Sequence, residues 1–399
     1  YARVDYNDDK LPTFTGLNAG TTYVILSLAK DPLSVTSLKV EVRPAGSKVS
    51  VIGAPNADGT QSGGMYQGLY DTSLTPKSNN SVAYPQVVAG SSFTAALAGD
   101  GTVWTWGSNE YGELGIGEVY GTYAYPQQVK QQDGKYLNNV RKLAATGNFI
   151  YALKNDGTVW AWGRNDRGQL GLGENTPVRV TLASQVLKGK QKNRTEPAEG
   201  QENYIQEIVD IAVGGVDDAH GFALMIQSVY YGRVYENGQL VSYSVLSNNV
   251  YGVGDNAAQQ LTGDTTTEKY SLPEVLDRVG DVAASLSASN SAAAYVLQAN
   301  GSIKAMGDNS QYALGIGEDS KNEVEGSVQL ESRALTVGAG RKNAMAVTFR
   351  VDQADNGSSV KVSSDTGHIY GWGLNSSENG TPFANVVNNA TEIFAPVQL

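Results

Sequence analysis

Residues 100–118 read DGTVWTWGSNEYGELGIGE, and residues 156–174, 56 positions further along, read DGTVWAWGRNDRGQLGLGE. Two stretches this similar show that the chain carries an internal repeat, and an internal period determines the fold class. Weaker copies of the same pattern occupy residues 250–264, 300–318 and 366–380, and residues 49–60 are a degenerate candidate. The repeat therefore runs through most of the chain.

Each copy has the pattern of short β-strands joined by tight turns. Apolar and polar residues alternate between Asp-Gly, Asn-Gly or Gly-rich stretches, and such pairs supply the positive-φ residue that a hairpin turn needs. In DGTVWTWG the alternation places Val103 and Thr105 on one face and Trp104 and Trp106 on the other. Because no apolar stripe with a period of 3.6 residues is sustained anywhere, we expect an all-β protein.

Aligning the copies on the glycine of the G-x-N sequence defines six units. The approximate repeats are 15–88, 89–140, 141–207, 208–280, 281–332 and 333–399. A unit of three or four short strands cannot bury its own faces, whereas closing the units into a ring removes the exposed strand edges. We therefore predict a single β-propeller over residues 1–399, with six blades, or seven if one unit is too degenerate to recognise. Residues 1–14, with ARVDY as a strand, are predicted to complete the last blade and close the ring.

The repeat also predicts a set of structural positions. The G-x-N residues and the tryptophans of the aromatic strand should lie at corresponding points of different blades, with at least one tryptophan of each pair packed between sheets. These residues are Gly107, Asn109, Gly163, Asn165, Gly254, Asn256, Gly307, Asn309, Gly373, Asn375, Trp104, Trp106, Trp160, Trp162 and Trp372.

The string AGSSFTAALAGDGTVWTWGSNEYGELGIGE, followed by YPQQV, resembles the repeat of the regulator of chromosome condensation family. The shared features are the small-residue apolar strand, the D-G turn, the W-G-x-N ending, the L-G-x-G and the closing proline, and they match closely over residues 88–187. The resemblance implies a bladed propeller, typically of seven blades. Family members include an exchange factor for a small GTPase, a secreted inhibitor of β-lactamases and many bacterial surface proteins, so the resemblance implies a scaffold whose loops carry the function.

Composition excludes several classes of function. The 399 residues include no Cys and two His, which excludes disulfides, Cys-ligated metal and thiol catalysis, and we predict no cofactor, no metal site and no catalytic residues. The net charge of −11, without a long basic segment, predicts no nucleic-acid partner. No window approaches the ~20 apolar residues of a membrane span, so we expect no direct membrane insertion. The absence of Cys, with abundant Asn, Ser, Thr, Gly and Tyr, favours an exported, extracellular or cell-surface protein.

Three units carry extra residues between the small-residue strand and the G-x-N strand, at 29–48, 226–246 and 350–365. These insertions should leave equivalent hairpins on one side of the ring and form a binding or assembly surface, or else merely cap the propeller. The candidate binding residues are tyrosines of the fourth unit and of the loop after residue 117, namely Tyr230, Tyr231, Tyr235, Tyr243, Tyr120, Tyr123 and Tyr125. Residues 188–203 have nearly balanced charge and no apolar anchor, which predicts a flexible loop.

The function expected from these observations is a non-enzymatic interaction or structural module of an exported or cell-surface protein. It would bind a protein or a glycan, or assemble with copies of itself, through loops on one face. One alternative is a soluble partner binder, acting as an enzyme inhibitor or a GTPase exchange-type factor. A second alternative is a carbohydrate-active enzyme with carboxylates in the central channel, since ring closure can bring together residues far apart in sequence.

Overall fold

The computed structural model describes residues 2–6, 12–16, 20–28, 31–42, 50–51, 70–71, 83, 85–189, 204–215, 220–236, 239–280, 282–353, 360–363, 367–376, 383 and 390–399. Side chains are described from residue 83 onward, apart from those of 229–247 and 351–362. In these parts of the chain the structure is β throughout, except for one turn of 3₁₀ helix at Glu318–Ser320. None of the described helices has the length and apolarity to cross a membrane.

Five four-stranded antiparallel sheets form the body of the molecule, and we call them blades 1 to 5. Blade 1 holds β7 (Gln86–Ala89), β8 (Phe93–Leu97), β9 (Val103–Ser108) and β10 (Thr122–Gln128), and blade 2 holds β11 (Val140–Thr146), β12 (Phe149–Lys154), β13 (Val159–Arg164) and β14 (Arg179–Gln185). Blade 3 holds β15 (Ile208–Gly215), β16 (Gly221–Glu236), β17 (Gln239–Asp255) and β18 (Lys269–Val275). Blade 4 holds β19 (Ala283–Ala288), β20 (Ala293–Gln298), β21 (Ile303–Gly307) and β22 (Glu325–Ser327), and blade 5 holds β23 (Arg333–Ala339), β24 (Asn343–Phe349), β27 (Ile369–Leu374) and β28 (Glu392–Gln398).

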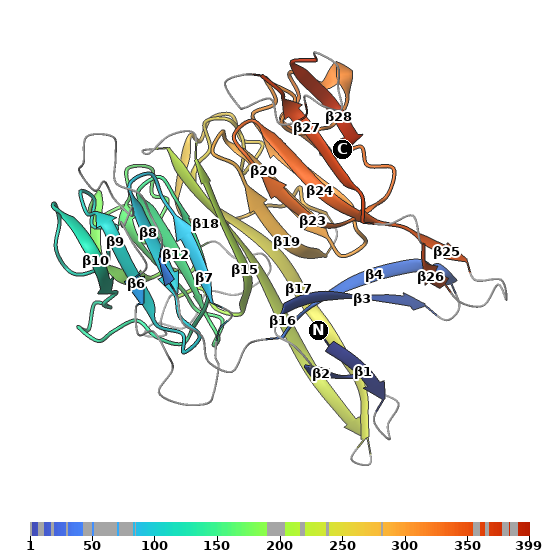
Figure 1. Cartoon of the computed structure of the whole chain (residues 1–399), viewed down its shortest axis with the longest axis horizontal. Helices are drawn as coiled ribbons and strands as arrows, with labels where there is room; N and C mark the ends of the chain where they lie inside the picture. The colour runs from blue at the N-terminus through green and yellow to red at the C-terminus, as the bar shows by residue number, and fades with distance from the viewer. Residues whose placement is uncertain are drawn as a thin grey trace.

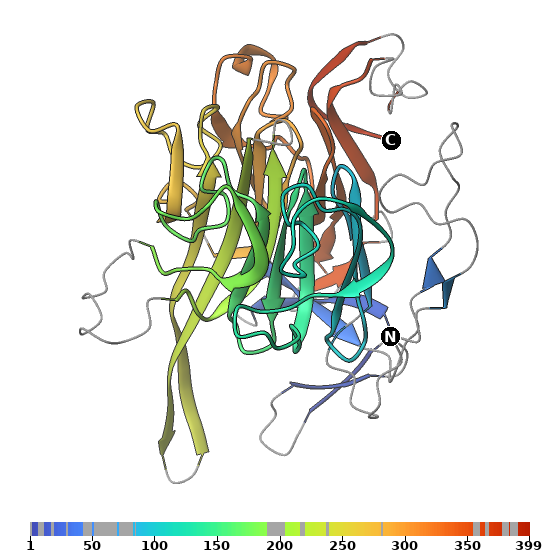
Figure 2. The same ribbon diagram turned by 90° about the vertical axis from the view of Figure 1, so that its left-hand side faces the viewer.

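The blades follow one another around a common centre (Figures 1 and 2). The first strand of each blade contacts the first strand of the next, in the order β7, β11, β15, β19 and β23, so these strands line the inside. The fourth strand of each blade is the last in its sheet and lies at the outside. The predicted all-β propeller is therefore confirmed.

The first predicted unit differs from the other five in the described part of the chain. Within residues 15–88 its strands form two separate two-stranded sheets, β3 (Gly20–Leu28) with β4 (Asp31–Val42) and β5 (Ser50–Val51) with β6 (Tyr70–Asp71). No sixth four-stranded blade is seen in the described residues, and a count of six or seven stays a prediction.

The expected closure of the ring by the N-terminal strand is wrong in this structure. The ARVDY segment does form a strand, β1 (Ala2–Tyr6), but it pairs with β2 (Pro12–Gly16) and not with blade 5. The fourth strand of blade 5 is β28, which follows β27 in the same unit. A local hairpin partner a few residues away costs less loop-closure entropy than a partner at the far end of the chain.

The glycines of the G-x-N sequences end the third strand of their blades in a conformation that other residues rarely adopt. Gly107, Gly163, Gly254, Gly307 and Gly373 all have positive φ, between 95° and 112°. A Cβ on Gly163 would lie 2.3 Å from the backbone oxygen of Asn148, and a Cβ on Gly307 would lie 1.9 Å from that of Ala292. Both the backbone angle and the close approach of a neighbouring loop therefore require glycine.

The asparagine of each G-x-N sequence is buried and holds the loop that follows. In blade 1 the Asn109 Oδ1 accepts from the Leu114 backbone N–H at 3.1 Å, and its Nδ2 donates to the Glu118 carbonyl at 2.9 Å. The same Oδ1 contact recurs at Asn165, Asn256, Asn309 and Asn375. A buried polar side chain must be hydrogen-bonded, and this asparagine holds the leucine five residues on in blades 1 to 4 and Phe383, eight residues on, in blade 5.

The predicted tryptophan positions all lie on third strands: Trp104 and Trp106 on β9, Trp160 and Trp162 on β13, and Trp372 on β27. Trp106, Trp162 and Trp372 are fully buried, whereas Trp104 and Trp160 are half-buried. The opposite face of β9 is buried as well, since Val103 and Thr105 are inaccessible. Blades 2 to 4 are covered on both faces because each packs between two neighbouring blades.

Candidate interaction surface

The register of the strands separates two rims of the propeller. In blade 2, Phe149 pairs with Gly163 and Leu153 with Val159, so the 154–159 turn and the 164–178 loop leave opposite ends of the sheet. We call the side of the turns between second and third strands the hairpin rim. We call the side of the loops between third and fourth strands the loop rim. Candidate binding residues from the sequence fall on both.

The tyrosines predicted in the fourth unit belong to the hairpin rim. Strands β16 and β17 continue past the end of their blade as a long two-stranded extension, in which Tyr230 pairs with Val245, Tyr231 with Ser244 and Tyr235 with Leu240. Tyr243 lies on β17 in the same extension. The orientations of these four side chains lie outside the described residues.

The insertion at 350–365 also contains a two-stranded pair, and the insertion at 29–48 contains β4, which pairs with the preceding β3. Residues 351–353 (β25, Val351–Gln353) pair with β26 (Val360–Val362) between the second and third strands of blade 5, as the long extension does in blade 3. Strand β4 of the first unit contacts β25. Figure 1 shows the β3–β4, β16–β17 and β25–β26 pairs projecting on the same side of the blades.

The tyrosines after residue 117 lie on the opposite, loop rim. Tyr120 is 58% exposed and adopts a φ of 67°, and Tyr125 is also exposed. The Tyr123 hydroxyl donates to Glu118 Oε2 at 2.8 Å, and this hydrogen bond raises the pKa of Tyr123. The structure therefore does not bring the two groups of candidate tyrosines together.

A cluster of two tyrosines and two arginines, which the sequence did not single out, crosses the boundary of blades 1 and 2 on the loop rim. The Arg164 Cζ lies 4.2 Å from the ring centroid of Tyr111, and the Arg179 Cζ lies 5.2 Å from that ring and 5.4 Å from the ring of Tyr120. The Arg179 Nε also donates to the Glu110 carbonyl at 3.1 Å. We call Tyr111, Tyr120, Arg164 and Arg179 the aromatic–arginine cluster.

The cluster has a smaller counterpart at the boundary of blades 4 and 5. Tyr312 packs edge to face on Phe394 with ring centroids 6.2 Å apart, and the Lys321 Nζ lies 5.1 Å from the Tyr312 ring. Lys321 also pairs with Glu392 at 3.0 Å. Aromatic and cationic side chains therefore gather where the loop of one blade meets the fourth strand of the next.

The glycines of the L-G-x-G sequence position these loops. The backbone N–H groups of Gly117, Gly173 and Gly317 each donate to a carbonyl on the fourth strand of the following blade, on Thr181, Ser271 and Phe394, at 2.8 to 3.0 Å. Each loop is thereby fixed to its neighbour. A surface built on such loops is preorganised, which lowers the entropy cost of binding a partner.

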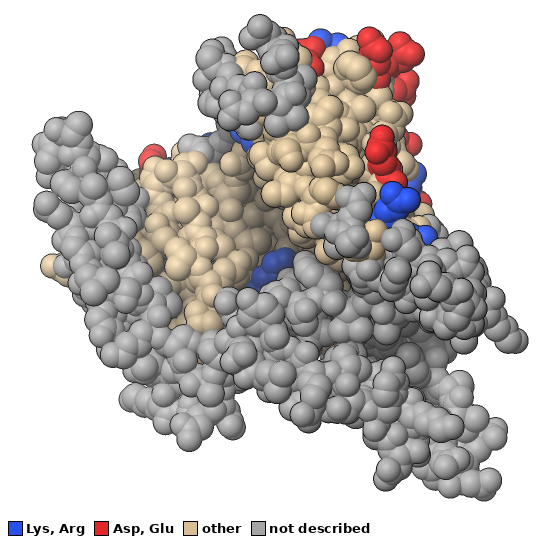
Figure 3. Space-filling model, turned by 45° about the vertical axis from the view of Figure 1, so that its right-hand side comes forward, with Lys and Arg blue, Asp and Glu red and all other residues tan. Residues whose placement is uncertain are grey.

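Two electrostatic features of the described residues concern acidic side chains. No group of three or more His, Asp or Glu side chains that could hold a metal ion is found among them. The buried Glu113 has a raised pKa because burial disfavours its charge, but its Oε2 is engaged by the Tyr111 backbone N–H at 2.6 Å. Figure 3 shows a hollow between two parts of the described surface with Lys or Arg on its floor, and acidic side chains on one flank.

Comparisons with known proteins match the repeat. Residues 100–153 and 156–215 match the profile of the Regulator of chromosome condensation (RCC1) repeat, and residues 86–113 and 140–169 match a second profile of the same repeat. The chain is 27% identical over 232 residues to the human probable E3 ubiquitin-protein ligase HERC3, covering 58% of this chain and 18% of HERC3. It is 32% identical over 114 residues to the Arabidopsis thaliana ultraviolet-B receptor UVR8, covering 28% of this chain and 25% of UVR8. The chain thus spans less than a fifth of HERC3 and a quarter of UVR8.

Solved structures share the fold. The Saccharomyces cerevisiae protein Prp20p, whose structure was reported with its binding to Gsp1p and histones, superposes with a TM-score of 0.58 at 16% identity, covering 98% of this chain and 77% of Prp20p. Human WBSCR16 superposes with a TM-score of 0.56 at 16% identity, covering 98% of this chain and 84% of WBSCR16.

Proposed function

Because the chain contains RCC1 repeats over residues 86–215 within a β-propeller, we propose that it is a protein-binding module whose partner docks on the loop rim of blades 1 and 2. The observation that carries this proposal is the aromatic–arginine cluster, in which Arg164 and Arg179 stack on Tyr111 and Tyr120 across the blade boundary. Tyr and Arg are the side chains enriched among residues that dominate the energy of protein interfaces.

The geometry supports recognition in two further ways. The exposed ring of Tyr120 is held by its contact with Arg179, and a hydrogen bond from its backbone N–H to the Asn109 carbonyl fixes its loop. A stacked guanidinium keeps some of its N–H donors for a partner, so the cluster offers an apolar face and a directional donor together. A protein surface with an acidic or carbonyl-bearing loop fits that chemistry.

Site-specific photocrosslinking tests the partner site. A photoreactive amino acid in place of Tyr120 should give a discrete adduct with one protein when the chain is expressed in its source cells. Tyr136 is the matched control, because it is 50% exposed but lies in the turn that joins β10 to β11, on the hairpin rim. Equal crosslinking from both positions, or none from Tyr120, would contradict the loop rim as the docking surface.

Affinity measurements with the identified partner complete the test. Replacing Tyr120 and Arg179 by alanine should weaken binding at least ~30-fold, the loss typical of residues that contribute about 2 kcal/mol at the centre of an interface. The Tyr136→Ala variant should bind as the unchanged protein does. An unchanged affinity in the double variant would sink the proposal.

The proposal extends to location. An exported protein on the cell surface fits a chain of 399 residues with no Cys, because such a fold does not depend on the redox state of its compartment. Treatment of intact source cells with a protease should therefore remove the propeller from the cells. Full protection of the chain from the protease would contradict this location.

A further inference from the structure

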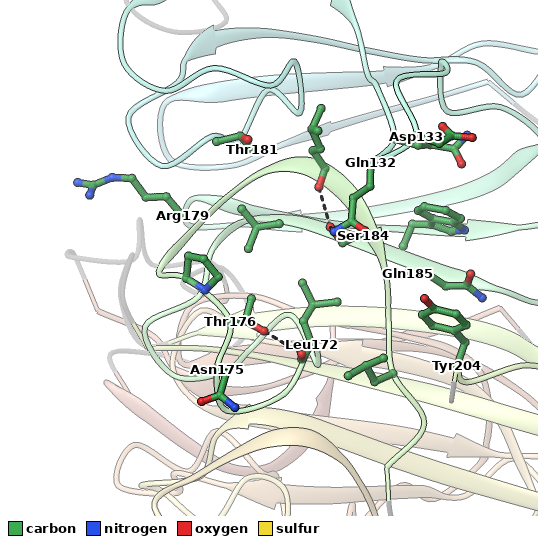
Figure 4. A pocket seen from close by; sticks show the side chains of 16 residues that line it. Gln132, Asp133, Leu172, Asn175, Thr176, Arg179, Thr181, Ser184, Gln185 and Tyr204 are labelled. Atoms are coloured by element: carbon green, nitrogen blue, oxygen red, sulfur yellow. Dashed lines mark hydrogen bonds between the residues drawn. The ribbon is translucent and has the colours of Figure 1, made fainter. Parts of the chain in front are cut away.

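A pocket of about 620 Å³ lies along the outside of blade 2 and borders the aromatic–arginine cluster at Arg179. Its wall is β14, and its ends are the loop that joins β10 to β11 and the loop that joins β13 to β14, as Figure 4 shows. The volume falls within the range of pockets that hold small ligands. The pocket is not recognisable from the sequence, because its lining residues come from four separate stretches, at 131–133, 160, 172–187 and 204.

The lining is mainly neutral and polar. Eight of its side chains carry an amide or a hydroxyl group: Gln131, Gln132, Asn175, Thr176, Thr181, Ser184, Gln185 and Tyr204. The half-buried Trp160 adds an aromatic surface, and leucines and a proline supply apolar patches. Donors, acceptors and apolar patches are therefore interleaved around one cavity.

The charged groups of the lining are already engaged. Asp133 pairs with Lys135 at 2.8 Å, and Figure 4 shows the Arg179 side chain extending away from Gln132 and Ser184, toward its contacts in the aromatic–arginine cluster. The Arg179 guanidinium therefore supplies no counter-charge between Gln132 and Ser184, and the Asp133 carboxylate is already paired. The pocket suits an uncharged ligand.

Several amides are held in place while keeping hydrogen-bonding capacity. Gln132 Nε2 donates to the Ser184 Oγ at 2.8 Å, and Gln131 Nε2 donates to the Tyr136 carbonyl at 3.2 Å, which leaves both amide oxygens able to accept. Among the described residues, the side chains of Asn175 and Gln185 have no hydrogen-bond partner. An amide that offers a donor and an acceptor side by side matches two neighbouring hydroxyl groups of a ligand.

Strand addition by a peptide does not fit this wall. The outer edge of β14 is already paired, since the Thr181 carbonyl accepts from the Gly117 N–H at 2.8 Å and the Ala183 N–H donates to the Lys130 carbonyl at 2.9 Å. An extended peptide backbone would have to break these bonds to join the sheet. The ligand must therefore be recognised by the side chains.

From this combination we infer that the pocket is a binding site for an uncharged saccharide chain. Amide and hydroxyl side chains would hold the sugar hydroxyls, and Trp160 would pack against a C–H face of a ring. The site adjoins the protein-docking surface proposed above and shares Arg179 with it, but the saccharide would be held by other residues of the lining.

Titration calorimetry of the full chain with cellohexaose, chitohexaose, mannohexaose and xylohexaose tests the inference, with an uncharged glutamine-rich decapeptide as a comparison. At least one saccharide should bind with a dissociation constant below about 1 mM. Binding of the peptide without any saccharide, or no binding at all, would overturn the inference.

Matched variants place the ligand in the pocket. Trp160→Ala and Gln185→Ala should each weaken saccharide binding at least tenfold. Trp104→Ala is the control, because Trp104 holds the same position on β9 and makes the same contact from its Nε1 to a threonine hydroxyl two residues earlier, but does not line the pocket. If Trp160→Ala does not fold, Gln185→Ala decides the question. Equal losses in the Trp104 and pocket variants would contradict the assignment.

Discussion

At the scale of single residues, one position of the repeat is occupied by Gln in two blades and by Glu in another, and the hydrogen bonding of the two side chains differs. Gln169 in blade 2 and Gln260 in blade 3 each accept a backbone N–H with the side-chain amide oxygen. Glu113 occupies the corresponding position in blade 1, where its Oε2 accepts the Tyr111 N–H, but its buried Oε1 has no hydrogen-bond partner among the described residues. Burial accordingly raises the pKa of Glu113.

We expect Glu113→Gln to stabilise the protein at neutral pH. Because its pKa is raised, the Glu113 carboxyl binds its proton more tightly in the folded state than in the unfolded state. The free energy of unfolding therefore falls as the pH rises above 4.5, the ordinary pKa of this carboxyl. The gain from Gln should be about 1 kcal/mol at pH 7, because Gln carries no charge that burial disfavours, and should vanish below pH 4.5, where Glu113 is protonated. Urea unfolding of both proteins at pH 4 and pH 7 measures this, and a gain independent of pH would contradict it.

At the scale of strands and loops, the third strand of one blade and the loop of the preceding blade form a repeated joint. The Trp162 Nε1 donates to the Glu113 carbonyl of blade 1 at 2.9 Å, and the Trp372 Nε1 donates to the Ala313 carbonyl of blade 4 at 2.8 Å. In both cases the acceptor residue directly precedes a leucine, Leu114 or Leu314, whose backbone N–H donates to the asparagine of the G-x-N sequence. Each of these tryptophans therefore stabilises the contact between two blades in two ways, through the apolar area that its ring buries and through one hydrogen bond from its Nε1.

Two substitutions at Trp162 separate these contributions. Trp162→Ala should lower the free energy of unfolding by about 3–5 kcal/mol, because it leaves a large cavity between blades. Trp162→Phe keeps most of the apolar surface but orphans the Glu113 carbonyl, and should cost about 1–3 kcal/mol. Denaturant unfolding measures both, and losses below 1 kcal/mol in the two variants would show that the ring does not join the blades.

At the scale of the whole molecule, the five described blades form an arc whose last member has one face without a neighbour. Met345 on β24 pairs opposite Gly371, at the position that Ala95, Tyr151, Leu224 and Tyr295 hold in blades 1 to 4. Those four residues are fully buried, whereas Met345 is 36% exposed and Ile369 beside it is 45% exposed. The next blade covers this face in blades 1 to 4, whereas no further blade is described beside blade 5.

An aspartate at this position should therefore destabilise blade 3 more than blade 5. Leu224→Asp places a charge between blades 3 and 4 and should cost at least about 4 kcal/mol of unfolding free energy. Met345→Asp places the charge on an accessible face and should cost less than about 1 kcal/mol. Thermal and urea unfolding compare the two, and an equal loss at Met345 would show that this face is covered in solution.

The sequence by itself determined the repeating unit, the all-β fold class and the glycine, asparagine and tryptophan positions that recur in it. These features depend on local rules: alternation places side chains on the two faces of a strand, and a positive φ or a close backbone approach requires glycine at Gly163 and Gly307. The fold class follows because such units can bury their faces only against one another.

The tertiary structure alone decided how the blades join and which surfaces they create. The stacking of Arg164 and Arg179 on Tyr111, the pocket along β14 and the accessible face at Met345 all depend on which segments, far apart in sequence, lie beside one another. Strand periodicity gives the face on which a side chain lies, but not which blade or loop stands opposite that face. That choice depends on the packing of whole blades, which no local pattern encodes.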